Sequence, residues 1–231
     1  MRVISSRQPC YFPGIPLLQR MLASNIHIIS DNVKFSRGDY ENRNWIKSAN
    51  GRQMLTIPVK AHSDTLVSQV EIDNTGMGTP KHWQAKHWRT LELAYQKALY
   101  WEEVAPLIHF LYRNEYRSLL QWHCDAYAAI LRVLATKPSL MLASSVPQVG
   151  TGSQRVLSMC QSLGANVYLA GEGARGYLNL ERFDYHNIKV IFSQSKEPIY
   201  PQLFGDRIQG LSCLDLLFNC GVTDAAWLLM G

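Results

Sequence analysis

A glycine-rich loop at residues 171–176 carries the residue types best suited to binding an anion. It follows an apolar run over residues 166–170, which predicts a buried strand. Ligands of open α/β sheets bind outside the carboxyl ends of strands, so the loop faces the expected ligand side. There Gly171 and Gly173 can bring backbone N–H groups close to an anion, and Arg175 supplies a planar guanidinium. The alternative is a tight strand-to-helix turn with a solvated arginine.

The helix that precedes this strand adds a second arginine. Apolar residues recur at helical spacing over residues 153–163, and Gly164 stands where a left-handed residue would end the helix. Arg155 lies near the start of that helix, where free backbone N–H groups favour an anion. We therefore expect Arg155 and Arg175 to bind a phosphate or carboxylate between them.

The N-terminal residues are typical of a strand, a loop, a helix and a second strand. The strands are expected at residues 2–6 and 26–30, and the helix at 16–23. This order predicts two parallel strands joined by a right-handed crossover. Gln8 and Asp31 then both follow strand ends on the ligand side. Asp31 is a candidate general base at that position.

A polar cluster precedes a predicted hairpin whose turn contains Asn50-Gly51. Either this cluster is a solvated loop or it binds substrate beside Asp31. We expect it to converge with the Gln8 loop and the 171–176 loop on one pocket, because all three follow predicted strand ends. The cluster consists of Arg37, Asn42, Arg43, Asn44 and Lys47.

Length and composition favour one large α/β domain. The 231 residues are 47% hydrophobic and 18% charged, which allows a sizeable core. We expect an N-terminal α/β part with the hairpin (1–75), a helical segment (76–138) and a C-terminal α/β part (139–231), all in one compact domain. The sheet should be mostly parallel, with a Rossmann-like or nucleotidyltransferase-like core. Its strands are expected near Arg2, Ile26, Ser139, Val167 and Val190.

The formal charge of +5 favours an anionic partner. A nucleotide-sugar or an activated acyl donor fits this charge, and so does tRNA. No apolar run reaches the roughly 18 residues of a membrane span, and the N-terminus lacks the apolar stretch of a signal peptide. The five cysteines include no C-x-x-C pair, which is typical of reduced thiols. We expect a cytoplasmic protein without a membrane span.

A doubled His-Trp pair, His82-Trp83 and His87-Trp88, stands in the helical segment. Metal-binding histidines on one helix usually stand four residues apart, as in H-E-x-x-H. The spacing here turns the two imidazoles roughly 140° apart around the helix axis. Without an acidic or thiolate partner nearby in the sequence, we expect no metal and no cofactor. His82 remains a candidate for deprotonating an amine.

Several motifs together resemble the WbqC-like family of bacterial proteins. The resemblance runs nearly end to end and is most specific in roughly the first 60 and the last 80 residues. The motifs are Gln8-Pro9-x-Tyr11-Phe12-Pro13, Phe35-Ser36-Arg37, Asn42-Arg43-Asn44-x-x-Lys47, Leu55-Thr56-x-Pro58-Val59-Lys60, Arg155-x-Leu157, Leu163-Gly164-Ala165, Tyr168-Leu169-x-Gly171, Tyr200-Pro201-Gln202 and Leu211-Ser212-x-Leu214-Asp215-Leu216-Leu217-Phe218-Asn219.

The resemblance implies a role in O-antigen or related polysaccharide pathways, with transfer of a glycyl or other acyl group to a sugar. It adds Tyr11, Tyr200 and Gln202 to the substrate-binding candidates. This chain departs from the family after its first motif. Relatives usually continue with aromatic-Leu-Gly-Tyr, whereas this chain has Gly14-Ile15-Pro16-Leu17. A larger pocket and a different substrate are two interpretations of that glycine.

Two functions compete at this point. The first is a transferase that moves an aminoacyl or acyl group onto an amino-sugar or similar amine, in polysaccharide or secondary-metabolite biosynthesis. Asp31 or His82 would serve as its base. The second is a non-catalytic protein that binds a sugar nucleotide or a nucleic acid such as tRNA. An enzyme should hold a titratable group near the arginines in one pocket, whereas a binding protein should show a basic surface groove.

Overall fold

The computed structural model describes residues 1–134 and 138–230, and its centre is a five-stranded parallel sheet. The strand order is β7-β2-β1-β8-β9. The α/β fold with a mostly parallel sheet is therefore confirmed, with a strand at each expected position. The more specific Rossmann-like or nucleotidyltransferase-like core stays a prediction. The strands are β1 (Val3–Arg7), β2 (Ile26–Ile29), β7 (Ser139–Leu142), β8 (Val167–Ala170) and β9 (Lys189–Phe192).

The strand order places β1 in the middle, with β2 and β7 on one side and β8 and β9 on the other. Ile4 of β1 pairs with Ile26 on one flank and with Tyr168 on the other, both in parallel. The chain therefore leaves β1 toward one half of the sheet and later returns to build the other half. Loops after β1 and β8 diverge at this reversal, which is where open α/β sheets form ligand crevices.

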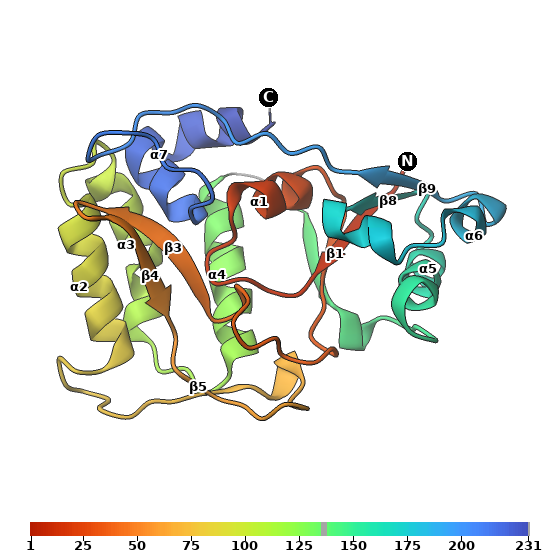
Figure 1. Cartoon of the computed structure of the whole chain (residues 1–231), viewed down its shortest axis with the longest axis horizontal. Helices are drawn as coiled ribbons and strands as arrows, with labels where there is room; N and C mark the ends of the chain where they lie inside the picture. The colour runs from red at the N-terminus through yellow and green to blue at the C-terminus, as the bar shows by residue number, and fades with distance from the viewer. Residues whose placement is uncertain (135–137, 231) are drawn as a thin grey trace.

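Two hydrophobic clusters cover the two faces of the sheet. Successive strand residues point to opposite faces, so Ile28 packs into one cluster and Ile29 into the other. The Ile28 cluster is closed by α5 (Gly152–Ser162) and α6 (Leu180–Tyr185). The Ile29 cluster is larger and includes α1 (Ile15–Leu22), α4 (Leu119–Val133) and α7 (Cys213–Met230). Figure 1 shows α5 and α6 at one end of the molecule and the helical segment toward the other.

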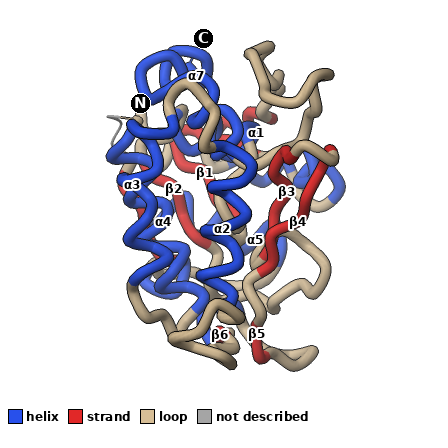
Figure 2. Tube along the Cα trace, turned by 90° about the vertical axis from the view of Figure 1, so that its left-hand side faces the viewer, coloured by secondary structure: helices blue, strands red, loops and turns tan. Residues whose placement is uncertain are grey.

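The helical segment packs on the larger cluster, together with the predicted hairpin. Its helices are α2 (Trp83–Tyr95), α3 (Trp101–Arg113) and α4, and Pro106 lies inside α3. The hairpin is β3 (Arg43–Ser48) and β4 (Gly51–Thr56), and Figure 2 shows it beside α2. Gly51 takes a φ of 93°, which accounts for glycine at this turn. The short elements are β5 (Val59–Lys60), β6 (Glu71–Ile72) and the 3-10 helices η1 (Val67–Gln69), η2 (Ala143–Ser145) and η3 (Glu172–Gly176).

Helix α7 bears on the expectation that the chain has no membrane span. By length and hydropathy it could cross a membrane, alone among the helices of the described residues. However, 56% of this window is buried inside the protein, where it packs against α1 and α3. Gly221 interrupts its backbone with a φ of 72°. These are features of a core helix.

Candidate functional site

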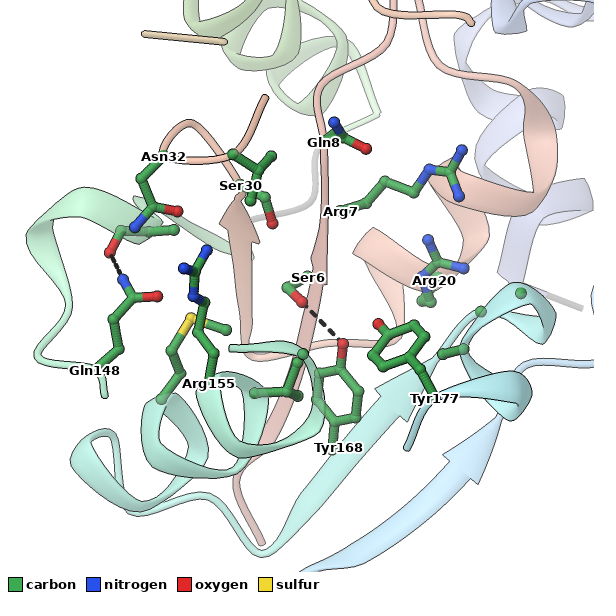
Figure 3. A pocket seen from close by; sticks show the side chains of 18 residues that line it. Ser6, Arg7, Gln8, Arg20, Ser30, Asn32, Gln148, Arg155, Tyr168 and Tyr177 are labelled. Carbon is green, nitrogen blue, oxygen red and sulfur yellow. Dashed lines mark hydrogen bonds between the residues drawn. The ribbon is translucent and has the colours of Figure 1, made fainter. Parts of the chain in front are cut away.

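A cavity of about 440 Å³ opens at the carboxyl ends of β1, β2 and β8. Figure 3 shows the side chains that line it, which come from β1, α1, the loop after β2, the 143–148 segment, α5 and the stretch from β8 through η3. Its position matches the reversal of strand order between β1 and β8. The lining residues are Ser6, Arg7, Gln8, Arg20, Ser30, Asn32, Val33, Ala143, Gln148, Gly152, Arg155, Val156, Met159, Tyr168, Gly171, Gly173, Ala174 and Tyr177.

Three arginines give this cavity a strongly positive character. Arg7, Arg20 and Arg155 all line it, and no aspartate or glutamate of residues 1–134 and 138–230 does. Among the described residues, none of the three forms an ion pair with a carboxylate. Guanidinium groups remain charged at all physiological pH values, so they require a negative partner or water. The cavity is therefore suited to an anionic ligand.

Arg20 is the most informative of the three, because its side chain is buried. The residue is 6% exposed, and its Nε has no hydrogen-bond partner among the described residues. Burial lowers the pKa of its guanidinium, since removal from water disfavours the charged form. A buried charge without a partner costs several kcal/mol in typical proteins. Such an arrangement is favourable when a ligand supplies the missing negative charge.

Gly171 is what allows Arg20 to reach the cavity. A Cβ atom added at position 171 would overlap Nη1 of Arg20 and lie 3.2 Å from its Cζ. The backbone of Gly171 is extended, with φ −80° and ψ 159°, which any residue can adopt. The glycine is thus required for space and not for conformational freedom. In Figure 3 the Arg20 side chain lies next to Arg7 and Tyr177.

The opposite side of the cavity combines Arg155 with two amides. Arg155 lies in the first turn of α5, and its Nε donates to the Gly150 carbonyl at 3.3 Å. Asn32 and Gln148 lie beside it in Figure 3. The side-chain carbonyl oxygens of both amides are buried without hydrogen-bond partners among the described residues. Unpaired buried acceptors are costly, so this side is suited to the hydroxyl or amide hydrogens of a ligand.

A tyrosine and a serine lie between the two sides. The Ser6 hydroxyl and the Tyr168 hydroxyl are 2.8 Å apart. Burial raises the pKa of Tyr168, so the phenol stays protonated and can donate a hydrogen bond. Neither group has a histidine or carboxylate partner that would make it a nucleophile.

Four of the residues expected from the sequence line this cavity: Gln8, Arg155, Gly171 and Gly173. Gln8 also donates through Nε2 to the Lys34 carbonyl at 3.0 Å, which fixes the loop after β1. Of the three segments expected to converge, the Gln8 loop and the glycine loop therefore line one cavity, and the 37–47 cluster does not. Their roles in binding stay a prediction.

The two candidate bases lie outside the cavity. Asp31 is buried, and its Oδ1 and Oδ2 accept hydrogen bonds from the backbone N–H and hydroxyl of Ser144, at 2.9 and 2.6 Å. It holds the start of η2 against β2, so both its oxygens are already in use. His82 stands at the N-terminus of α2, where its Nε2 is 3.2 Å from Oδ1 of Asn74. Burial lowers the pKa of His82, but no cavity-lining group contacts it.

The polar cluster at residues 37–47 serves mainly to hold backbone segments together. Arg37 donates to the Ala61 carbonyl, Arg43 to the Gly38 carbonyl and Asn42 to the Ile57 carbonyl. Asn44 donates to the backbone carbonyls of Tyr11 and Phe12. Lys47 donates to the backbone carbonyl of Asp206 at 2.6 Å. The structure does not bring these five side chains to the arginine-lined cavity. The sequence did not indicate these hydrogen bonds, because most of the carbonyl acceptors lie in segments that are distant along the chain.

Arg175 is likewise engaged elsewhere. Its Nε donates to Oε2 of Glu172 at 2.6 Å, and its guanidinium stacks over the ring of Phe192 at 4.0 Å. Both side chains of this ion pair are more than half exposed. Arg155 and Arg175 therefore do not face one ligand position, and the expected pair is replaced by Arg155 with Arg7 and Arg20.

The three candidates added by the family resemblance lie in hydrogen-bonded parts of the core. The Tyr11 hydroxyl is 2.8 Å from that of Tyr112. The Tyr200 hydroxyl donates to Asp215 at 3.0 Å. Gln202 donates to the Ile208 carbonyl at 2.9 Å. None of the three lines the arginine-lined cavity.

Glu41 is a titratable residue that the sequence did not single out. It is 2% exposed, and burial raises its pKa to about 7. Its Oε2 accepts the Ser36 N–H at 2.7 Å, while Oε1 has no partner among the described residues. Arg7 and Gln8 are among the groups close enough to affect its titration. Nothing in the local sequence distinguishes this glutamate, because its burial depends on distant segments.

The structure offers no sign of a metal centre in residues 1–134 and 138–230. No group of three or more histidine, cysteine, aspartate or glutamate side chains there is arranged to hold an ion. The positive cavity is also unsuited to a cation, since its charged lining residues are arginines.

Comparisons with known proteins connect this fold to one family. The family model described as the WbqC-like protein family matches residues 8–226. An uncharacterised protein of Mycobacterium tuberculosis is 30% identical over 232 residues, covering 96% of this chain and 95% of its own length. No solved structure matches the chain.

Proposed function

The chain belongs to the WbqC-like protein family, and on that premise we propose that it is a transferase that binds an anionic, activated donor in the arginine-lined cavity. It passes an acyl or aminoacyl group from this donor to the amine of an amino-sugar or similar molecule. The donor is a nucleotide-linked or otherwise phosphate-bearing compound. The pathway is bacterial polysaccharide biosynthesis of the O-antigen type or a secondary-metabolite route, and it operates in the cytoplasm.

One observation carries this proposal: three arginines without carboxylate partners in the described residues face one cavity at the strand ends. Arginine forms paired hydrogen bonds with phosphate and carboxylate oxygens, so the cavity can hold an anionic donor in a defined orientation. Arg7 and Arg20 lie together in Figure 3, and Arg155 lies across from them. A ligand with two separated anionic or polar groups satisfies both sides.

The chemistry is direct attack of the acceptor amine on the donor carbonyl. The lining contains serines and tyrosines, but none is paired with a base, so no covalent intermediate on the protein is invoked. A bond forms between the amine nitrogen and the carbonyl carbon. The bond from that carbon to the carrier breaks, the carrier leaves with the electron pair, and it takes up the proton lost by the amine. Arg7 and Arg20 stabilise the negative charge that develops on the carbonyl oxygen.

A proton acceptor assists such a reaction when its pKa lies near the working pH. Glu41 meets this requirement, with a pKa of about 7. Its unpartnered Oε1 can receive the proton through a water molecule that connects it to the cavity. In this proposal Glu41 is a positioning and relay residue, because it does not line the cavity.

The alternative function is a non-catalytic protein that binds a sugar nucleotide or tRNA. The absence of a paired nucleophile in the cavity lining favours this alternative. Both functions require an anionic ligand, so binding alone does not distinguish them. The distinction lies in whether a bound acyl donor reacts with an amine.

The proposal is tested in two steps. Thermal midpoints are first measured with inorganic pyrophosphate, UDP, UDP-glucose, acetyl-CoA and charged tRNA, because a ligand of the native state raises the midpoint. Acetyl-CoA and charged tRNA, the two members of the panel that carry an acyl group, are then offered as donors with hydroxylamine as the acceptor, and the hydroxamate formed is measured against a protein-free control. Hydroxamate formation that depends on Arg155 supports the transferase. Binding of the panel without any hydroxamate supports the binding protein, and no binding at all refutes both.

A further inference from the structure

A second, smaller cavity adjoins the first. Its volume is about 290 Å³. Arg7 and Arg20 line both cavities, so this arginine pair forms the boundary that the two spaces share. The second cavity is built from the loop after β1, the start of α1, the 40–44 loop and the extended segment before α7. Its lining residues are Arg7, Cys10, Gly14, Pro16, Leu17, Arg20, Tyr40, Asn44, Glu197, Gly210 and Leu211.

The walls of this second cavity are mainly apolar and well packed. Cys10, Leu17 and Leu211 are each at most 7% exposed. Burial raises the pKa of the Cys10 thiol to about 11, so the thiol is protonated and behaves as a small apolar group. Asn44 uses its amide on the backbone of Tyr11, Phe12 and Trp45. The cavity thus offers an apolar surface that begins at two cationic groups.

The charges of the cavity also define a direction. Glu197 is the single carboxylate that lines it within the described part of the chain, and both of its oxygens accept the Gly210 N–H at 3.0 Å. A negatively charged group entering the cavity is attracted by Arg7 and Arg20 and repelled by Glu197. An occupant with one anionic or carbonyl end therefore binds with that end at the arginines and its apolar part among Cys10, Leu17 and Leu211.

We infer that this second cavity receives a short aliphatic acyl group, which is the group that the donor carries to the arginine pair. The inference rests on the proposed transferase function and specifies its substrate. The anionic carrier lies in the larger cavity, the reacting carbonyl lies at Arg7 and Arg20, and the acyl chain extends into the smaller cavity. A glycyl group has no side chain that fills this space, so the lining favours an aliphatic acyl donor over a glycyl donor.

Gly14 provides a means to close the second cavity without straining the backbone. Its φ and ψ are −66° and 161°, which all residues adopt readily. A Cβ atom at this position would have ordinary contacts, with the Leu211 carbonyl oxygen at 3.6 Å and Pro16 Cδ at 3.9 Å. Both of these residues are cavity walls, so a longer side chain at position 14 enters the cavity.

The test uses acetate, butanoate and hexanoate as probes of the intact chain. Binding is followed by NMR titration of the ¹⁵N-labelled protein. We expect affinity to rise about fourfold for each added methylene that is buried, until the cavity is full. Gly14→Leu should abolish this gain while leaving acetate binding unchanged, and Gly14→Ala is the matched control that should retain most of it. Arg20→Lys should weaken all three probes by a similar factor.

Equal affinity for the three carboxylates overturns the inference, and so does a Gly14→Leu variant that binds all three as the native chain does. Failure of this inference is distinguishable from failure of the proposed function. Pyrophosphate binding and hydroxamate formation without any dependence on chain length refute the acyl cavity alone. A chain-length dependence without hydroxamate formation from any donor refutes the transferase and leaves a carboxylate-binding protein with an apolar subsite.

Discussion

Replacing Gly171 by alanine tests whether Arg20 binds the anion. The added methyl group would overlap Nη1 of Arg20 and lie 3.2 Å from Cζ, so the guanidinium must move away from β8. Arg20 can move because its side chain has no hydrogen bond or ion pair within the described residues. The charge is retained in this variant, and its position alone changes.

The size of the effect follows from the kind of contact that is lost. A hydrogen bond pair between arginine and an anion contributes about 1.5–3 kcal/mol, which corresponds to a roughly ten- to hundredfold loss of affinity. Stability should not fall, because the extended backbone at position 171 accepts a Cβ. Replacing a glycine also lowers the conformational entropy of the unfolded chain, which stabilises the native state by about 0.4–1 kcal/mol. Displacing a buried, unpaired charge also removes a cost from the native state.

The assay is calorimetric titration with inorganic pyrophosphate, together with the thermal midpoint of the free protein. Gly173→Ala is the matched control, because Gly173 lines the same cavity but an added Cβ there meets nothing within 4 Å. We expect weak binding with a midpoint equal to or slightly above the native value for Gly171→Ala, and native affinity for Gly173→Ala. Native affinity in Gly171→Ala, or an equal loss in both variants, refutes the role of Arg20.

Three further predictions concern the arginines, the buried aspartate and pH. Arg155→Lys should weaken pyrophosphate binding about tenfold or more, because lysine cannot form the paired contact with an anion. Arg175→Lys should bind pyrophosphate as the native chain does, and calorimetry that gives the two variants the same affinity contradicts this prediction. Asp31→Ala should lower the free energy of unfolding, measured in urea, by about 2–4 kcal/mol, since two hydrogen bonds to a carboxylate are lost. A variant that is as stable as the native chain but inactive would instead indicate that Asp31 is a catalytic base. Burial lowers the pKa of His27 and His123 to about 3 and of His87 to about 4, so the stability they contribute is complete above their unfolded pKa of about 6.5 and is lost as the pH falls. Between pH 5 and 6 Glu41, whose pKa is raised to about 7, binds one more proton in the native state than in the unfolded state, and this offsets one of the three histidines. The free energy of unfolding should therefore fall by about 2–3 kcal/mol for each unit by which the pH is lowered in that range. A flat profile there is inconsistent with three neutral imidazoles.

The Glu41 contribution can be isolated with Glu41→Gln. Because its native pKa of about 7 exceeds the unfolded value, the native state binds the extra proton between the two. The variant should therefore match the native chain below about pH 4.5 and be more stable by up to about 3 kcal/mol above pH 7. Urea unfolding across pH 4.5–8 measures this difference. A constant difference at all pH values would show that Glu41 does not titrate in this range.

Much of the fold could be predicted from the sequence because its elements are encoded locally. Short apolar runs near Ile26, Val167 and Val190 became parallel strands, and Asn50-Gly51 became a hairpin turn. The same local information predicted that Gln8, Arg155 and the glycine loop follow strand ends or begin a helix. These residues meet at one cavity because parallel strands place their carboxyl ends at the same edge.

Tertiary structure alone decided which charges are free. Arg20 lies inside α1 and looks like a solvated helix residue in the sequence, yet packing against Gly171 buries it in the cavity. Arg175 looked like an anion-binding residue, yet its guanidinium stacks over the ring of Phe192 on β9 in addition to its local ion pair with Glu172. Whether a charge is available depends on what lies within a few ångströms of it, and residues far apart in the sequence supply most of those neighbours. Sequence periodicity therefore determined the sheet and the edge where a ligand would bind, and long-range packing determined which side chains face that ligand.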